Sequence, residues 1–253
     1  MLTLARLQLQ QLLTGKKVWL LLIFMLLPLA LTVTLVWGNA FRNEQLEAVS
    51  IYLFILHLVA FSILLCLVYG TSVIGADVDD RTIVYLFTRS KARWEVFVGK
   101  YLAIVALLSC CGVIDFLISW LLLGCPGGFM LAFAFVIAIV AAMFAYTAIF
   151  AALGVLFTKR AMVVGLLYAF IFEWGVSFVP AVVNKLTVTH QLRSIIARLV
   201  EFDLDQLHRT ALRMVGDASL VEAAIALTLI TGIALFLAAF VVTRREYSGA
   251  QQS

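Results

Sequence analysis

Three ionisable side chains, His57, Asp115 and Glu173, lie inside long apolar runs of the sequence. A charged side chain at the centre of a bilayer costs about 2.5–3.5 kcal/mol on insertion scales, so such a residue faces the bundle interior, a partner or a water-filled cavity, or is protonated. Two interpretations stay open for these residues. They tie spans together through hydrogen bonds, or they act in a transport pathway.

The densest charge in the sequence lies between two of the apolar runs, at residues 75–100, where five bases and four acids fall in 26 residues. Asp79 and Asp80 stand where a helix N-terminus favours negative charge, and an apolar surface follows at 82–87. This pattern predicts a short amphipathic helix outside the membrane, followed by the bases Arg89 and Arg93. Such a segment is either a docking surface for a cytoplasmic partner or an ordinary positively charged loop.

Motifs for enzymatic chemistry lack essential parts. Ser72 lacks the second glycine of a nucleophile elbow, the three histidines are scattered, and there is no HExxH pattern. The segment before Lys16 has Gln10 where a phosphate-binding loop needs glycine. The four cysteines have no metal-ligand spacing and fit small buried hydrophobic positions: Cys66, Cys110, Cys111 and Cys125. We therefore expect a chain without catalytic, cofactor or metal sites.

Composition indicates an all-α integral membrane protein. Of 253 residues, 64% are hydrophobic and 13% charged, and the mean hydropathy is +1.11, outside the range of soluble domains. A spanning helix needs about twenty apolar residues. Six runs are long enough: Val18–Trp37, Ile51–Ile74, Tyr101–Leu123, Phe129–Phe157, Ala161–Val183 and Leu220–Val242. Together they predict one transmembrane domain over 1–253, with an amphipathic interfacial helix at 1–17.

Lysine and arginine counts give the orientation. Twelve lie on the side of the N-terminus, the 75–100 break and the C-terminus, and six lie on the other side. The positive-inside rule places the first side, with both termini, in the cytoplasm. At 1.5 Å per residue, Glu173 is then about 18 Å and Asp115 about 22 Å from the cytoplasmic ends of their runs. His57 is about 9 Å from the outer end of its own run, so we expect the three residues to share one layer.

The long outer connection at 184–219 also has a helical pattern. Leu192, Ile195, Ile196 and Leu199 recur at helical spacing against polar residues, and a similar pattern continues beyond 204. Two amphipathic helices are expected here. They lie on the outer leaflet, cap the exit of a pathway, or dock an extracytoplasmic partner.

Two stretches resemble a known family. The first holds Asp80-Arg81-Thr82, Tyr85-Leu86, Thr88-Arg89, Arg93-Trp94 and Gly99-Lys100-Tyr101-Leu102-Ala103, and the second runs from Tyr168 to Leu192. Both are similar to permease subunits of type-2 ABC exporters, relatives of the permease used in nitrous oxide reductase maturation. Where that family commonly has proline after Thr-Arg, this chain has Ser90.

The resemblance implies that the 75–100 break is the coupling helix, which docks into a separate ATPase subunit. By this resemblance, ATP binds to that partner, and this chain needs no cofactor. The implied ATPase-coupling residues are Asp79, Asp80, Arg81, Thr82, Tyr85, Leu86, Phe87, Arg89 and Arg93. Glu173 matches an acidic position that the family often carries in its fifth span.

The expected function is that of an ABC exporter permease in the cell inner (plasma) membrane, not an enzyme. Its expected partners are cytoplasmic ATPases, a second permease copy or a related permease, and membrane lipid, but no nucleic acid. The alternative is a secondary transporter or channel of six spans that works without an ATPase.

Overall fold

The computed structural model describes residues 17–38, 46–79, 93–158, 160–175, 185–200 and 219–244, with the side chains of Lys17, Leu46, Glu47 and 74–79 left out. In these segments the chain is 94% helical and has no strands, which confirms the all-α prediction for the described part.

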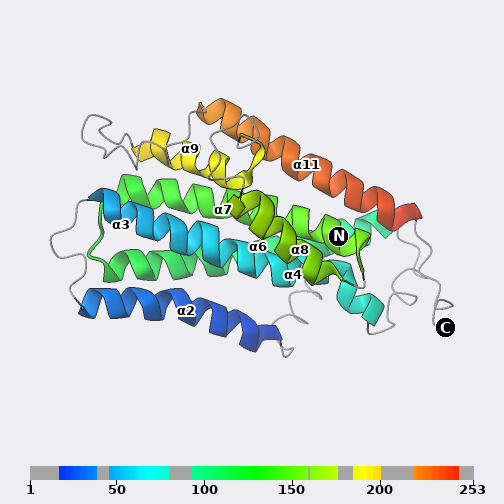
Figure 1. Cartoon of the computed structure of the whole chain (residues 1–253), viewed down its shortest axis with the longest axis horizontal. Helices are drawn as coiled ribbons and strands as arrows, with labels where there is room; N and C mark the ends of the chain where they lie inside the picture. The colour runs from blue at the N-terminus through cyan, green and yellow to red at the C-terminus, as the bar shows by residue number, and fades with distance from the viewer. Residues whose placement is uncertain are drawn as a thin grey trace.

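Ten helical elements make up most of the described segments, and Figure 1 shows how they are arranged. Three of them, α3, η1 and α4, follow one another without a break and form one long helix, and α8 continues in the same way into η2. In chain order the elements are α2 Lys17–Trp37, α3 Leu46–Leu53, η1 Phe54–Phe61, α4 Ser62–Asp79, α6 Arg93–Leu122, α7 Gly128–Leu156, α8 Ala161–Tyr168, η2 Ala169–Gly175, α9 Val188–Val200 and α11 Leu220–Arg244, where η denotes a π-helix.

Five helices are long and apolar enough to cross a membrane: Val18–Trp37, Ala48–Val73, Arg93–Leu122, Gly128–Leu156 and Leu220–Arg244. They correspond to five of the six expected spans and indicate a membrane protein. The expected fifth span is described only over the 15 residues Ala161–Gly175, and 176–184 lie outside the described residues. A count of six therefore stays a prediction, as does the interfacial helix at 1–17.

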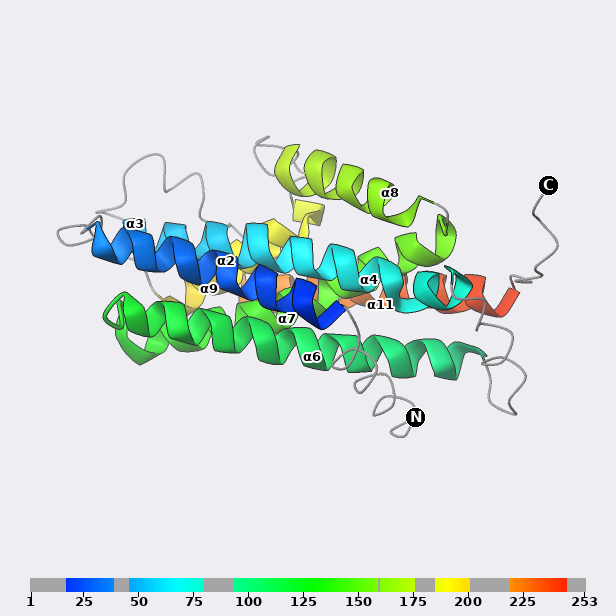
Figure 2. The same cartoon turned by 90° about the horizontal axis from the view of Figure 1, so that it is seen from below.

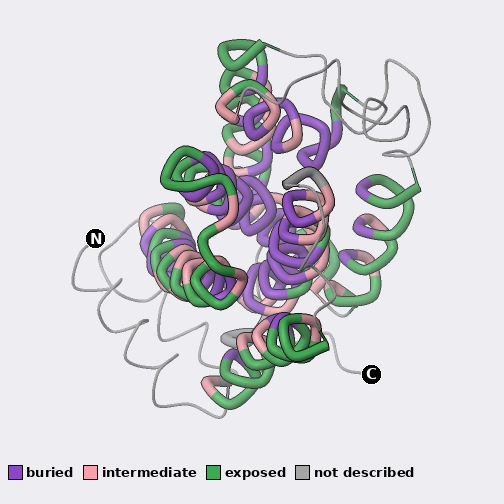
Figure 3. The backbone as a smooth tube through the Cα atoms, turned by 90° about the vertical axis from the view of Figure 1, so that its left-hand side faces the viewer, coloured by how far each residue is buried: buried purple, intermediate pink, exposed green. Residues whose placement is uncertain are grey.

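Helix α7 forms the centre of the bundle. It packs against α4, α6, α8, α9 and α11 and is buried on several faces, many of them made by alanine. A helix that is hydrophobic all round belongs in an interior, and the tube view shows buried residues along the central helices (Figure 3). On either side of the α3–α4 helix lie α6 and the α8 segment (Figure 2). The core is therefore built around one apolar helix.

Helices α2 and α11 lie at the edge of the bundle and expose large apolar side chains. Trp19 of α2 is 68% exposed and Phe236 of α11 is 70% exposed. In water such faces would be costly, whereas in a bilayer they contact lipid tails or another membrane helix.

Close packing in the core depends on glycine. A Cβ on Gly154 of α7 would lie 2.6 Å from the carbonyl oxygen of Thr71 in α4. On the opposite side of the same contact, a Cβ on Gly70 would lie 2.8 Å from Cβ of Phe150. Helices in membranes use such small residues to let their backbones approach. The α4 and α7 helices are held together in this way.

Two helix boundaries extend past the apolar runs toward the charged break. Helix α6 begins at Arg93, eight residues before the expected start at Tyr101, and α4 continues to Asp79, five residues past Ile74. At 1.5 Å per residue these extensions add about 12 Å and about 7.5 Å of helix. The extension of α6 is packed, since Val96 and Phe97 are buried.

Candidate functional site

Most of the residues expected to contact an ATPase lie outside the described residues: Asp80, Arg81, Thr82, Tyr85, Leu86, Phe87 and Arg89. Asp79 is the last residue of α4 and Arg93 is the first residue of α6. These two positions bracket the undescribed segment, so the coupling helix stays a prediction.

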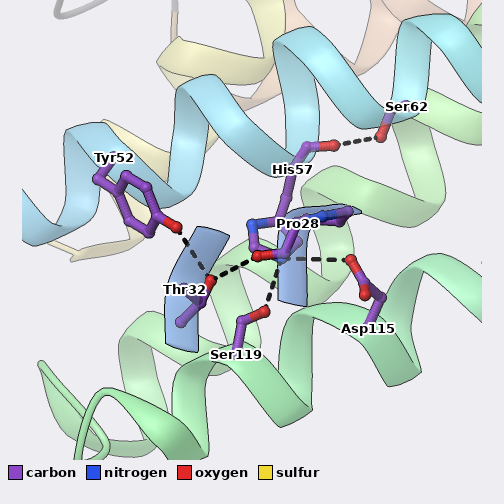
Figure 4. A network of polar contacts seen from close by, with 7 residues as sticks. All are labelled: Pro28, Thr32, Tyr52, His57, Ser62, Asp115 and Ser119. Carbon is purple, nitrogen blue, oxygen red and sulfur yellow. Dashed lines mark hydrogen bonds and ion pairs between the residues drawn. The ribbon is translucent and has the colours of Figure 1, made fainter. Parts of the chain in front are cut away.

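Two of the three ionisable residues within the apolar runs meet in the bundle. Nε2 of His57, on η1, lies 3.4 Å from Oδ2 of Asp115, on α6, and both side chains are 0% exposed. The same Nε2 lies 3.2 Å from Oγ of Ser119, also on α6 (Figure 4). The result is a His–Asp–Ser cluster shielded from solvent.

The cluster forms because each element presents its side chains at the right register. Asp115 and Ser119 are four residues apart and therefore lie on one face of α6. His57 lies in the π-helix η1, where the backbone N–H of Ser62 donates to the carbonyl oxygen of His57, five residues earlier. The Ser62 hydroxyl donates to the same oxygen at 2.7 Å. Short π segments inside α-helices occur frequently at functional sites.

Aromatic rings and helix α2 enclose the pair. The ring of Phe116 stands edge-on to His57 at 5.6 Å between centroids, and Phe61 is edge-on at 6.5 Å. On the α2 side, Thr32 shares a 2.9 Å hydrogen bond with the hydroxyl of Tyr52 and donates to the carbonyl oxygen of Pro28 (Figure 4). Thus one polar contact ties α2 to the helix that carries His57.

Asp115 has few hydrogen-bond donors around it. Within the described part of the chain, neither of its carboxyl oxygens accepts a hydrogen bond, and its closest ionisable neighbour is His57, at 3.4 Å. A buried carboxylate without donors is unfavourable by several kcal/mol. The proton state of the His–Asp pair must therefore compensate the charge.

Glu173 lies in a different environment. It is 1% exposed and sits on η2, where its carboxylate accepts five hydrogen bonds. Oε1 accepts from the hydroxyl of Tyr168 at 3.2 Å and from the backbone N–H of Val188 at 3.2 Å. Oε2 accepts from the hydroxyl of Tyr146 and from the backbone N–H of Thr189, both at 3.0 Å, and from the Thr189 hydroxyl at 2.6 Å.

The donors around Glu173 come from three other elements. Tyr146 lies on α7, Tyr168 ends α8, and the two backbone N–H groups belong to the first residues of α9. The first N–H groups of a helix have no partner within it, and the positive end of the helix dipole favours an anion. The carboxylate on η2 therefore caps the N-terminus of α9 and fastens that helix to the bundle.

Helix α9 is the first of the two amphipathic helices expected at 184–219, and 201–218 lie outside the described residues. It packs against α7 and α11 (Figure 1), and its buried face includes the polar residues Thr189, Gln191 and Ser194. Thr187 accepts a hydrogen bond from the backbone N–H of His190, as an N-cap threonine does.

Sequence reasoning selected His57, Asp115 and Glu173 but missed their partners. Ser119 had a signal, because it follows Asp115 at helical spacing. The Thr187-Val188-Thr189 start of α9 also had one, because threonine before an apolar-periodic segment is typical of an N-cap. Tyr146 had none, since one tyrosine in an apolar run does not reveal what its hydroxyl contacts.

No group of three or more histidine, cysteine or acidic side chains in the described segments is arranged to hold a metal ion. No known family model matches the chain, and no curated protein matches it significantly. The arguments for function therefore rest on the residues and on their geometry.

Proposed function

We propose that the chain is the permease subunit of an ABC exporter. In this proposal two six-span subunits, as a homodimer or with a related permease, form the pathway in the plasma membrane. Two separate ATPase subunits dock against the 79–93 segments on the cytoplasmic side. Their closure on ATP moves the spans as rigid bodies.

The observation that carries the proposal is that helix extends into the charged break from both sides and that the extension of α6 is packed. Helix α6 starts at Arg93 and buries Val96, Phe97 and Lys100 before its expected span begins. Helices α4 and α6 also pack on each other. A loop that served only as a topological signal would not need packed helices at its base. A loop that receives force from a partner does, because a rigid mount transmits displacement to the spans.

The docking segment offers hydrophobic anchors of the kind that fill a groove on a partner. Tyr85 and Leu86 follow the acidic start of the segment and precede Arg89 and Arg93. Buried interface anchors typically cost about 1–3 kcal/mol when truncated, which corresponds to about a 5- to 150-fold loss of affinity. The bases would hold the orientation of the segment through carboxylate contacts.

The test is co-purification of the tagged chain with its ATPase, followed by a screen for substrates that stimulate ATP hydrolysis. Tyr85→Ala with Leu86→Ala should reduce ATPase recovery and stimulated hydrolysis, with unchanged amounts in the membrane fraction. The matched control is Leu237→Ala with Phe240→Ala, a leucine and an aromatic side chain on the exposed face of α11. Unchanged ATPase recruitment and hydrolysis in the Tyr85 and Leu86 variant would reduce the segment to a topological signal.

A second candidate is a proton-coupled secondary transporter, favoured by the buried His57–Asp115 pair. Proton relays made of acidic and histidine side chains are characteristic of pumps and transporters. The two functions predict different energy sources. Transport by the chain alone in vesicles, driven by an imposed proton gradient without ATP, would support the secondary transporter and oppose the exporter.

A further inference from the structure

The bundle contains two buried intramembrane carboxyl groups with opposite surroundings. Glu173 accepts five hydrogen bonds, two of them from the N-terminus of a helix. Asp115 accepts none from the described residues and has His57 at 3.4 Å. Donors compensate the charge of the first carboxylate, and the second needs a different form of compensation.

A proton is the compensation that the geometry allows. With a neutral imidazole beside an ionised carboxylate, the fully buried pair would carry an uncompensated negative charge, which an apolar interior disfavours by several kcal/mol. One proton makes the net charge of the pair zero, whether it lies on Nε2 of His57 or on Oδ2 of Asp115. The proton passes between these atoms without any change in that total.

Among the side chains that the structure describes, none brings another charge to the pair. Tyr52 from α3 and Cys111, one turn before Asp115 on α6, face it with side chains that are ordinarily neutral near pH 7. The central helix α7 contains no ionisable residue except Tyr146, which is bonded to Glu173. Helix α9 carries Arg193 and Arg198, and the Arg193 guanidinium is 5.5 Å from the Phe54 ring centroid. Lys100 is the eighth residue of α6, 15 residues before Asp115. The remaining charged residues of these helices lie near helix ends: Lys17 of α2, Glu47 of α3, Asp77 and Asp79 of α4, Arg93 and Glu95 of α6, and Glu222 and Arg244 of α11.

We propose that His57 and Asp115 form a proton-binding site that holds one proton between η1 and α6. Ser119 positions the imidazole through its contact with Nε2, and the π-helix sets the register of His57 toward α6. The ligand of the site is a proton, taken up from water. The inference does not rest on an ATPase partner, since the isolated chain carries every group involved.

The test is reversible unfolding of the purified chain in mixed micelles, measured as a function of pH for the wild type and for Asp115→Asn. The native wild type holds one proton on the pair. The native Asn variant holds none, because its buried imidazole has no anion beside it. Above about pH 5 the two unfolded chains bind protons alike, since an exposed aspartate titrates near 3.9. Where the native state binds more protons than the unfolded state, the free energy of unfolding decreases as the pH rises.

The unfolding constant of the wild type, divided by that of Asp115→Asn, should therefore increase about tenfold per pH unit between about pH 5 and pH 8. Ser109→Ala is the matched control, because it removes a hydroxyl group from the same helix, six residues before Asp115, without removing a titratable group, and its profile should parallel the wild type. Parallel profiles for the wild type and Asp115→Asn would overturn the proposal.

A second variant keeps the test decisive if Asp115→Asn does not fold. In His57→Gln the carboxyl group should retain the proton, so its profile should parallel the wild type above about pH 7, where an exposed histidine is mostly neutral. Infrared spectra of this variant should contain the C=O stretch of a neutral carboxyl group. A parallel profile without that band would mean that neither native chain binds the extra proton, and it would refute the proton site.

Discussion

Replacing Glu173 by leucine should detach α9 from the bundle and destabilise the whole fold. The leucine fills a similar volume but accepts no hydrogen bonds. The hydroxyls of Tyr146 and Thr189 lie 3.0 Å apart and can pair with each other. Two buried backbone N–H groups, those of Val188 and Thr189, lose their acceptor. At about 1–3 kcal/mol for each unsatisfied group, the expected loss of unfolding free energy is about 2–6 kcal/mol.

Replacing Glu173 by glutamine should cost less. The amide oxygen can take the place of Oε2 and accept from Thr189, while the amide NH2 takes the place of Oε1. There Tyr168 can rotate its hydroxyl to accept, but the N–H of Val188 faces another donor. One buried donor is lost, at about 1–3 kcal/mol. If only one carboxylate oxygen accepted hydrogen bonds, glutamine would be fully tolerated. Because both oxygens accept them, the stability of the glutamine variant should lie between those of the wild type and the leucine variant.

Two measurements separate global from local effects. Reversible unfolding in mixed micelles gives the free energy for the wild type and the two variants. Thiol labelling of Ser194→Cys, a 0% exposed position on α9, reports whether that helix stays seated. The labelling background replaces Cys110, Cys111 and Cys125 and keeps Cys66, which is fully buried.

The leucine variant should unfold more easily and label faster at position 194 than the glutamine variant, and both should exceed the wild type. A leucine variant with wild-type unfolding and a protected position 194 would refute the capping role of Glu173. Normal folding with lost transport in the glutamine variant would instead place the charge of Glu173 in the pathway.

Two further predictions concern packing and topology. Gly154→Ala should lower the unfolding free energy by about 1–3 kcal/mol, because the added Cβ meets backbone of α4. The control Gly232→Ala, where nothing lies within 4 Å, should leave it unchanged or slightly higher. Single cysteines at Ser90 and Ala211 should react with impermeant reagents from opposite sides of sealed cells. Labelling of both from outside would contradict the six-span arrangement.

The helical class and five of the spans could be predicted because the length of each run of apolar residues can be counted in the sequence. The expected first span, Val18–Trp37, coincides with a helix of the structure, whereas α6 starts at Arg93 rather than Tyr101. That difference arises because a hydropathy count ends at Lys100, while the structure buries Lys100 at 6% exposure. A hydropathy average scores lysine as a charged residue and therefore cannot show that the Lys100 side chain packs against the bundle.

The candidate site was only partly predictable because depth along a helix is one coordinate out of three. Counting at 1.5 Å per residue put His57, Asp115 and Glu173 at similar depths. Lateral neighbours decide which of them meet. His57 and Asp115 face each other across η1 and α6, while Glu173 binds residues of α7, α8 and α9.

The helix register adds a second obstacle. His57 and Glu173 each lie in a π-helical segment, Phe54–Phe61 and Ala169–Gly175. A π turn changes the direction in which later side chains point relative to a regular α-helix, so face assignments at 3.6 residues per turn fail beyond it. No composition signal in these apolar stretches distinguishes a π turn from an α turn.

The structural role of Glu173 and the proton-binding role of His57 both depend on a π-helical segment. Each segment departs from regular α-helix geometry and places one ionisable side chain against a different helix. His57 contacts α6, and Glu173 contacts the start of α9. At Glu173 the target supplies backbone donors, which fix a carboxylate in place. At His57 the target supplies a carboxyl group without donors, which leaves a proton as the shared element. Restoring α-helical register at either segment by deleting one residue should therefore have different consequences. Deletion in η2 should release α9, whereas deletion in η1 should separate His57 from Asp115 and leave the proton on the buried carboxyl group, as in His57→Gln.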